Sequence, residues 1–504
     1  MGASRAAKPR VMDAVQRAVL ARTPFAANRI RYIGTAGEAF ADACTGRNPR
    51  CEVVRDPADR APVEALAADD LARLLADPDA SALLAGADVV ATAIPAGTTD
   101  AEALLQALGA GDLEVLHIQA LDSQAFDPKT FGYFDDIRRE RTAAWRAGEL
   151  PSPTAEPLIV VARRPGGPPL MQLSMFSFAP VMMDIRTRLP AAAMRSEPEL
   201  LVQHVRPPGG LEPAPYDQPK VLVIQRPAPP KNVAGWKQSI RDWVRDGWVS
   251  VVEFDDHPTL IALTAGREVD ESHWLRFSAA HAVQTSTPLL EDLFRKFNPE
   301  TRSFPNAVFR LERFPENLPK RVFYGAIQRG EHAAEVARSL RPAIARFPGV
   351  EFVVVGDRAV FDALPAPRKR YHELVSYEEY LRLMGECSIS LSPLEDNDLN
   401  AAKSDAKFLD AASRGVLTIA SRPVYGDVIR HGENGLIAER TEDWAGLLSD
   451  ILADDAARRE MARTAWAYVR DKRMFADQTR ERLAWYRDLW NRREELNAAV
   501  LARL

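Results

Sequence analysis

Cysteine is scarce in this sequence: 504 residues contain only three, Cys44, Cys51 and Cys387. Their spacing matches no metal-binding motif, and an odd number cannot pair into a complete disulfide framework. The sequence therefore predicts neither a metal centre built on cysteine nor a disulfide scaffold. Because a chain without disulfides suits a reducing compartment, we expect a cytoplasmic protein.

Long apolar runs and an excess of basic charge are also lacking. No stretch has the length of a membrane span, and the N-terminal residues lack a secretory apolar segment. The net charge is −5 and no Lys/Arg run is interleaved with aromatic residues, which argues against a nucleic-acid partner. Residues 10–22 have the pattern of a basic amphipathic helix. Two interpretations are open for it: packing on the first domain, or peripheral association with a membrane surface.

The length suits two or three domains, each with its own core. Residues 1–150 contain alternating strand-like and helix-like segments from residue 30 onwards, which predicts a parallel sheet. Proline and glycine are concentrated near both ends of residues 150–170 and indicate a boundary there. The alternation resumes over 151–315 and 316–470. Residues 471–504 then read as a long helical segment.

The first domain has a glycine-bearing turn, Gly34 to Gly37, after its first strand, and Asp56 just past its second strand. This layout resembles the Rossmann-like domain of S-adenosylmethionine-dependent methyltransferases, which implies that Asp56 would hold ribose hydroxyls. A turn role for Asp56 is the alternative. Because only two glycines of the cofactor loop are present, we expect a degenerate domain with a structural or docking role.

Two carboxylates and an imidazole, Asp255, Asp256 and His257, follow a predicted strand at 249–254. Ligands of open α/β sheets bind at the carboxyl ends of the strands, so this position favours a functional site. An Asx-type turn with a surface histidine is the competing interpretation. A metal site is a third, although no ligand set of known spacing accompanies these residues. His281, inside a later strand, is predicted to be a packed core histidine.

The stretch Asn400 to Gly415 carries the most informative pattern in the chain. Ser404 is expected to be an N-cap, residues 405–414 a short helix and Gly415 its end. Lys407 shares one helix face with Asp410 and Arg414, while the opposite face is apolar. Lys403 and Lys407 crowd the helix N-terminus, where the dipole disfavours positive charge. A bound anion such as a diphosphate would relieve this conflict. A solvated face with ordinary surface lysines is the alternative.

Residues 316–470 resemble the donor-binding domain of family-4-like retaining GT-B glycosyltransferases. The segments that carry the resemblance are Phe323-Tyr-Gly-Ala with Arg329, Val353 to Asp357, Glu373 to Tyr377, and Asp410 to Gly415. A Pro-Asn turn at 305–306 resembles the passage between the two domains of that fold. The resemblance implies an α/β fold of GT-B architecture, with two facing Rossmann-like domains behind the extra N-terminal Rossmann-like domain. The C-terminal helix would cross back to the acceptor domain.

The same resemblance assigns roles to single residues. It implies that Gly325 and Arg329 bind the diphosphate, that Asp357 and Val375 line the base, and that Asp410 holds the ribose. The family's two glutamates, eight positions apart, correspond here to Ala402 and Asp410. The pattern Asn400-x-x-Lys403-Ser404-x-x-Lys407 is similar to bacterial polysaccharide glycosyltransferases and adds Lys403, Ser404 and Lys407 to the donor site.

The leading hypothesis is a nucleotide-sugar-dependent hexosyltransferase that acts on a glycan, a lipid-linked or a protein acceptor in bacterial polysaccharide or glycoconjugate assembly. Retention is expected from the resemblance. Independence of metal ions is expected because Arg329, Lys403, Lys407 and the helix N-terminus can neutralise the leaving diphosphate, and no cofactor besides the donor substrate is expected. Asp255, Asp256 or His257 would orient or deprotonate the acceptor hydroxyl. Arg186 and Arg188 either face the cleft or form a charged helix start. The alternatives are an S-adenosylmethionine-dependent methyltransferase with a glycan-recognition module, and a non-catalytic scaffold.

Overall fold

The computed structural model of the chain describes residues 20, 23–33, 38–55, 89–94, 114–120, 158–163, 171–179, 182–197, 199–207, 209–211, 214–264, 266–327 and 329–504. Gly34, Gly37 and Asp56 lie outside these residues, as does nearly all of segment 10–22, so the predictions made on them stay predictions. The chain divides into two compact units. One consists of Met1–Met175, Arg188–Val221 and Thr479–Leu483, and the other of Phe176–Thr187, Leu222–Gln478 and Ala484–Leu504.

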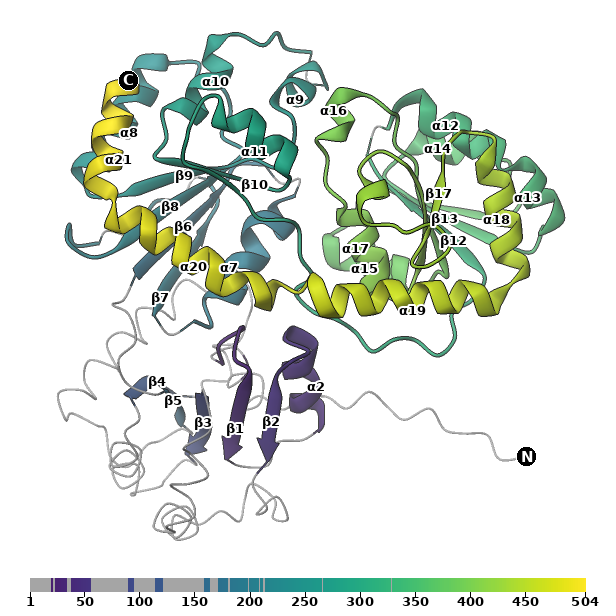
Figure 1. Cartoon of the computed structure of the whole chain (residues 1–504), viewed down its shortest axis with the longest axis horizontal. Helices are drawn as coiled ribbons and strands as arrows, with labels where there is room; N and C mark the ends of the chain where they lie inside the picture. Colours follow the sequence, from purple (N-terminus) through teal and green to yellow (C-terminus); the bar gives the residue numbers. More distant parts are fainter. Residues whose placement is uncertain are drawn as a thin grey trace. The chain divides into compact units, whose positions relative to one another are not determined.

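The N-terminal sheet has five strands in the order β2-β1-β3-β5-β4 (Figure 1). Its elements are β1 (Arg29–Ile33), α2 (Glu38–Arg47), β2 (Glu52–Arg55), β3 (Val89–Ile94), β4 (Glu114–Ala120) and β5 (Leu158–Arg163). Strand β1 pairs in parallel with β2 and β3, whereas β5 is antiparallel to both β3 and β4. The strands that precede residue 150 therefore share one direction, as predicted. The sheet also includes β5, which lies after residue 150.

The second sheet has the order β11-β10-β9-β8-β6-β7. Its strands are β6 (Met171–Ser177), β7 (Leu200–Val205), β8 (Lys220–Gln225), β9 (Val249–Glu253), β10 (Ala282–Thr285) and β11 (Thr301–Ser303). The helical segments between them are η2 (Asp184–Arg188), α7 (Leu189–Met194), α8 (Val233–Arg245), α9 (Pro258–Thr264), α10 (Glu271–Ser278) and α11 (Pro288–Arg295). Polar caps fix where helices begin, because Asn232 accepts from the Gly235 N–H and Thr287 from the Leu290 N–H.

The third sheet is parallel throughout, with the order β14-β13-β12-β15-β16-β17. Its strands are β12 (Arg321–Gly325), β13 (Glu351–Val355), β14 (Lys369–His372), β15 (Ile389–Ser392), β16 (Leu417–Ser421) and β17 (Leu436–Ala438). Alternate residues of β12 enter different cores: Val322 and Tyr324 pack into one hydrophobic cluster and Phe323 into another. This alternation with helices on both faces is what the βα pattern of residues 316–470 predicts.

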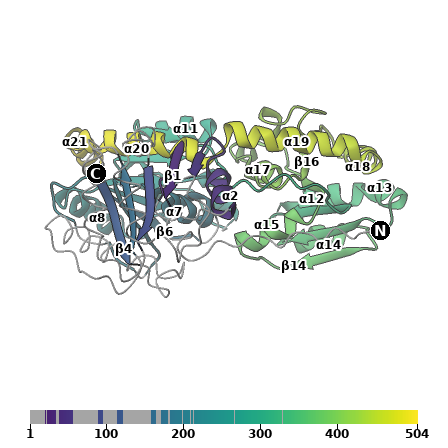
Figure 2. The same ribbon diagram turned by 90° about the horizontal axis from the view of Figure 1, so that it is seen from below.

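Helices cover both faces of the third sheet (Figure 2). They are α12 (Gly330–Ser339), α13 (Arg341–Arg346), α14 (Arg358–Ala363), α15 (Tyr377–Gly385), α17 (Ala406–Ser413), α18 (Asp443–Ala453) and α19 (Asp455–Lys472). The short helix α16 (Asp398–Ala401) has no buried residue. Helices α12, α13, α14 and α18 supply one buried cluster, while α15 and α17 pack on the other face.

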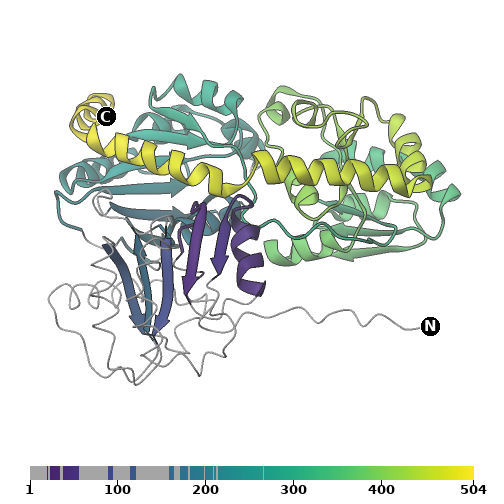
Figure 3. The same ribbon diagram turned by 60° about the horizontal axis from the view of Figure 1, so that its bottom comes forward.

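The C-terminal helical run lies against the second sheet (Figure 3). It breaks at Arg492 into α20 (Phe475–Asn491) and α21 (Arg493–Arg503). The Tyr486 hydroxyl donates to the Gln284 side chain at 2.6 Å, and Asn497 lies 2.9 Å from His281. His281 is fully buried there, which confirms its prediction as a core histidine.

The α/β fold class and the two Rossmann-like sheets of a GT-B architecture are thus confirmed, together with an additional N-terminal α/β sheet. The chain connects the second and third sheets twice, near Val308 and near Arg473, and these two connecting segments are hydrogen-bonded to each other. Val308 donates its N–H to Arg473 at 2.8 Å and accepts from Phe475 at 2.9 Å. Among the described residues, no helix combines the length and the apolar character that crossing a bilayer requires.

Arg186 does not face a cleft, so that interpretation is wrong. Its guanidinium is buried and binds Glu253, whose side chain is also fully buried, at 2.8 Å. Because a buried carboxylate needs a partner of opposite charge, Glu253 at the end of β9 draws the arginine into the core. Arg188 lies at the C-terminal end of η2 and is only partly buried.

Candidate functional site

The order of strands in the third sheet changes direction between β12 and β15. Strands β12, β13 and β14 succeed one another toward one edge, and β15, β16 and β17 toward the other. A crevice at the carboxyl ends of the strands forms at such a point and is the usual ligand site of open α/β sheets. Gly325 ends β12, Arg329 immediately precedes α12, and the segment leading to α17 follows β15. The predicted donor residues therefore converge on this switch point.

Gly325 is a glycine because neighbouring rings leave no room for a side chain. A Cβ atom at this position would lie 2.4 Å from the Tyr380 ring and 2.7 Å from the Phe323 ring. Without a side chain at this position, the two rings pack directly against the backbone at the end of the strand. Lys407 Nζ donates a hydrogen bond to the Gly325 carbonyl oxygen.

Ser404 is not the N-cap of α17, which corrects the sequence prediction. Asp405 occupies that position with φ −78° and ψ 17°, and its side chain makes no capping hydrogen bond. The Ser404 hydroxyl instead accepts from Asn306 Nδ2 at 2.7 Å. The oxygen expected to cap the helix is therefore bonded to a residue 98 positions away. The predicted end is confirmed, because Gly415 has φ +68° and follows the helix.

The polar face of α17 is not a solvated face. Asp410 is 8% exposed and accepts from the Tyr377 hydroxyl at 2.6 Å. Burial raises the pKa of Asp410 to about 6, although the Tyr377 hydrogen bond and the Lys407 charge act in the opposite direction. The Lys407 ammonium lies 5.7 Å from the centre of the Tyr380 ring. The alternative of ordinary surface lysines is therefore wrong for Lys407.

Three cationic groups act on one another at the switch point. Burial and the positive charges of Arg329 and Lys403 together lower the pKa of Lys407 to about 7, although the Asp410 charge acts in the opposite direction. Burial also lowers the pKa of Lys403, as do Arg329 and, more weakly, Arg226. Within the described part of the chain, no carboxylate forms an ion pair with the Arg329 guanidinium. These partly buried cations repel one another, and a bound anion would relieve that repulsion.

Asp357 and Val375, predicted to line a nucleotide base, have partners in the protein. Asp357 is buried and caps α14 by accepting from the Val360 N–H at 3.3 Å. Its second carboxylate oxygen accepts from the Tyr324 hydroxyl at 3.1 Å and from the Arg329 N–H at 3.3 Å. Val375 packs partly against the cluster around β12 and β13. Contact of either residue with a base stays a prediction.

The acidic pair of the second sheet lies beside a lysine of the third. Asp255 follows β9 and binds Arg226 at 2.6 Å. Asp256 lies 3.7 Å from Arg226 and 3.4 Å from the Lys403 ammonium. Residues predicted separately as acceptor-side and donor-side groups are therefore joined by an ion pair. Of these two carboxylates, Asp256 is the more exposed, with 18% of its side chain accessible against 2% for Asp255.

His257 is poorly arranged to act as a base. Its Nδ1 accepts from the Thr259 N–H at 3.2 Å, which places the proton of the neutral ring on Nε2. Burial lowers its pKa, so the ring is neutral near pH 7. The Asp256 carboxylate accepts from the N–H of the next residue, His257, at 3.0 Å. An Asx turn needs a bond to the N–H two residues on, so this contact does not establish the competing interpretation. Among the described residues, no three His, Cys, Asp or Glu side chains are grouped as a metal ion would require.

Sequence reasoning missed Arg226, Tyr377 and Asn306. Arg226 directly follows the last residue of β8, a position at the ligand-binding edge that could have identified it. Tyr377 begins α15 behind its cap Ser376, and no local signal indicates that its hydroxyl meets Asp410. Asn306 lies in the passage between the two sheets, and its contact with Ser404 depends on tertiary structure alone.

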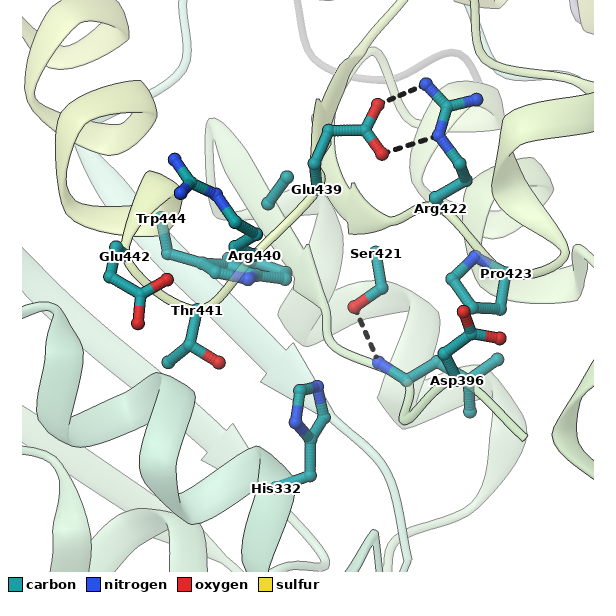
Figure 4. A pocket seen from close by; sticks show the side chains of 12 residues that line it. His332, Asp396, Ser421, Arg422, Pro423, Glu439, Arg440, Thr441, Glu442 and Trp444 are labelled. Atoms are coloured by element: carbon teal, nitrogen blue, oxygen red, sulfur yellow. Dashed lines mark hydrogen bonds and ion pairs between the residues drawn. The ribbon is translucent and has the colours of Figure 1, made fainter.

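A pocket of about 380 Å³ lies at the carboxyl ends of β15, β16 and β17 (Figure 4). Its lining is mostly polar and comes from His332, Leu394, Asp396, Ser421, Arg422, Pro423, Ala438, Glu439, Arg440, Thr441, Glu442 and Trp444. Arg422 and Glu439 bind each other across its rim, with Nε 2.5 Å from the carboxylate. None of the residues predicted for the donor site appears in this lining, although His332 belongs to α12 and Leu394 and Asp396 follow β15.

Comparison with known proteins gives one family match and several structural likenesses. Residues 332–484 match the family described as glycosyl transferase-like. No curated protein matches the chain. The matched residues include Lys403, Lys407 and Asp410 but neither Gly325 nor the acidic pair after β9.

Three solved structures illustrate the likenesses. TarM of S. aureus, in complex with fondaparinux, α-GlcNAc-glycerol and UDP, has 12% identity and a TM-score of 0.40 over 54% of this chain, which spans 55% of TarM. Anabaena HepE with UDP and glucose has 11% identity and a TM-score of 0.41, covering 62% of this chain and 98% of its own. Sucrose-phosphate synthase of Thermosynechococcus elongatus has 13% identity and a TM-score of 0.46, covering 64% of this chain and 99% of its own.

Proposed function

We propose that this protein is a nucleotide-sugar-dependent glycosyltransferase that transfers a hexose-type sugar to a glycan, lipid-linked or protein acceptor. The observation that carries the proposal is the convergence of Arg329, Lys403 and Lys407 at the switch point of the third sheet. The family match over residues 332–484 supports the same activity. Bacterial polysaccharide or glycoconjugate assembly in the cytoplasm is the setting that the sequence resemblance favours.

The proposed chemistry needs charge stabilisation on the donor side. When the bond between the anomeric carbon and the phosphate oxygen breaks, negative charge grows on the departing nucleoside diphosphate. Arg329, Lys403 and Lys407 would neutralise it from fixed positions, which is the most effective use of preorganised charge. These side chains remove the need for a metal ion at the leaving group, so we propose a metal-independent reaction.

The acceptor side depends chiefly on Asp256. A hydroxyl that attacks the anomeric carbon must lose its proton, and a carboxylate within reach can take it. Asp255 is almost fully buried and held by Arg226 at 2.6 Å, and the basic nitrogen of His257 accepts a backbone hydrogen bond. Asp256 is the more exposed carboxylate, with 18% of its side chain accessible, and is therefore the one that an acceptor hydroxyl can reach. Retention of anomeric configuration is proposed from the resemblance alone, because Ala402 supplies no carboxylate.

Thermal unfolding with added ligands tests the proposal. UDP, GDP, CMP and S-adenosylmethionine are added separately to the full chain. A ligand at a hundredfold excess over its dissociation constant stabilises the folded state by about 2.7 kcal/mol. We expect the unfolding temperature to rise with one nucleoside diphosphate. A rise with S-adenosylmethionine alone would favour the methyltransferase hypothesis, and no rise with any of the four would favour a scaffold.

A further inference from the structure

Arg226 is strained where it leaves β8. Its backbone has φ +46°, a left-handed conformation that costs a non-glycine residue free energy. Its N–H donates to the Glu253 carbonyl at 2.9 Å, so the strained residue stays tied to the end of β9. Such strain persists only where surrounding contacts determine the conformation, and here the side chain adds its own contacts to that backbone bond.

The Arg226 guanidinium reaches two consecutive carboxylates. Its Nε lies 2.6 Å from Asp255, and a terminal nitrogen lies 3.7 Å from Asp256. Only 13% of the arginine side chain is exposed. A planar, permanently charged fork can orient two acceptors at once, which a lysine ammonium does less well.

Asp256 in turn holds Lys403 at the donor site. Both Asp256 oxygens lie 3.4 Å from the Lys403 ammonium. The lysine backbone is anchored on both sides, because Thr287 donates to the Ala402 carbonyl at 3.2 Å and Asn306 donates to Ser404 at 2.7 Å. The lysine backbone is therefore fixed, and its ammonium is shared between Asp256 and whatever anion occupies the switch point.

Arg226, Asp256 and Lys403 form an alternation of positive, negative and positive charge. We propose that Arg226 is a positioning residue: it fixes the Asp255–Asp256 pair and weakens the hold of Asp256 on Lys403, which leaves the lysine available to the donor diphosphate. This inference rests on the proposed function. Without the arginine, Asp256 has one cation instead of two and binds Lys403 more tightly.

Binding of UDP and GDP by isothermal titration calorimetry tests the inference. In Arg226→Ala we expect the affinity of the nucleotide that the wild type binds to fall about threefold or more, the size of coupling seen between neighbouring charges. Arg226→Lys should recover part of the loss. The double variant Arg226→Ala/Asp256→Asn should bind as Asp256→Asn does, because the competing carboxylate charge is gone. Arg245→Ala is the matched control, since Arg245 also pairs with two aspartates but is exposed.

A merely structural arginine would give another result. Arg226→Ala would then lower the unfolding temperature and leave the affinity of the folded protein unchanged, and that outcome overturns the inference. Failure of the double variant to recover the affinity of Asp256→Asn overturns it as well.

Labelling of Lys403 provides a readout without any nucleotide. Amine acylation of the ligand-free protein at pH 8, followed by mass spectrometry, reports the fraction of uncharged Lys403. Because the Arg226 charge lowers the pKa of Lys403, its removal should slow labelling of Lys403 relative to the wild type, while Arg245→Ala should not. Equal rates in wild type and Arg226→Ala contradict the inference. Slower labelling in a protein that binds neither nucleotide supports the role of Arg226 and refutes the proposed function.

Discussion

Lys407→Met is expected to weaken nucleoside diphosphate binding about 10- to 100-fold, the effect of losing a charged hydrogen bond of about 1.5–3 kcal/mol. Lys407 has the most strongly lowered pKa of the lysines at the switch point, and its ammonium is placed by the Gly325 carbonyl at the end of β12. Methionine keeps much of the length of the side chain and removes its charge. Calorimetry with UDP and GDP at pH 6.5, where the lysine is mostly protonated, measures the loss.

A matched lysine separates this effect from general damage to the domain. Lys369 also donates to backbone carbonyls, those of Phe361 and Leu364, both at 2.7 Å, but it belongs to β14 at the sheet edge. Lys369→Met should bind the nucleotide as the wild type does. Equal affinities for Lys407→Met and the wild type would show that α17 has no phosphate-binding role.

Arg186→Met is expected to lower the free energy of unfolding by about 3–5 kcal/mol, because it leaves a carboxylate buried without its counter-ion. Arg186 donates to both oxygens of Glu253, at 2.8 and 3.2 Å. It also donates to Asn306 Oδ1 and to the carbonyls of Phe304 and Thr285, at distances from 2.9 to 3.0 Å. Urea unfolding followed by tryptophan fluorescence measures the change.

Two further variants make this prediction specific. Arg245→Met removes an exposed arginine from its pairs with Asp242 and Asp246 and should cost less than about 1 kcal/mol. In Arg186→Met/Glu253→Gln the buried charge is gone, so the loss should be smaller than the sum of the two single losses. A loss below about 1 kcal/mol in Arg186→Met would contradict the account of this network.

Local patterns predicted the elements of the fold and the edge at which the site lies. The βα alternation after residue 316 gave the strands of the third sheet, because buried parallel strands are short apolar runs between helices. It also placed Gly325 and Lys407 at strand and helix ends that meet at the switch point. The turn after β9 was visible for the same reason, since Pro258 cannot continue a strand.

Contacts between distant segments could not be predicted in this way. Ser404 has the residue type of an N-cap, but its hydroxyl is used by Asn306, which lies 98 positions earlier. Arg186 has the pattern of a charged helix start, yet Glu253 draws it into the core. A local pattern states what a side chain can do, and the tertiary partner decides which of those uses occurs.

The pH dependence of nucleotide binding tests the central claim most directly. Burial and the neighbouring charges of Arg329 and Lys403 lower the pKa of Lys407 to about 7, and only the protonated lysine attracts an anion. A bound diphosphate raises that pKa, so binding takes up a proton above pH 7 and affinity falls as pH rises. We measure the dissociation constants of UDP and GDP between about pH 7.5 and 9, above the second phosphate pKa of about 6.

For the wild type the account predicts an affinity that falls by up to about tenfold per pH unit over this range, the limit for uptake of one proton. Lys407→Arg should bind with a much flatter pH profile, because arginine stays charged throughout. The same pH profile in the wild type and in Lys407→Arg, or no binding of either nucleotide, would contradict a diphosphate site built on Arg329, Lys403 and Lys407.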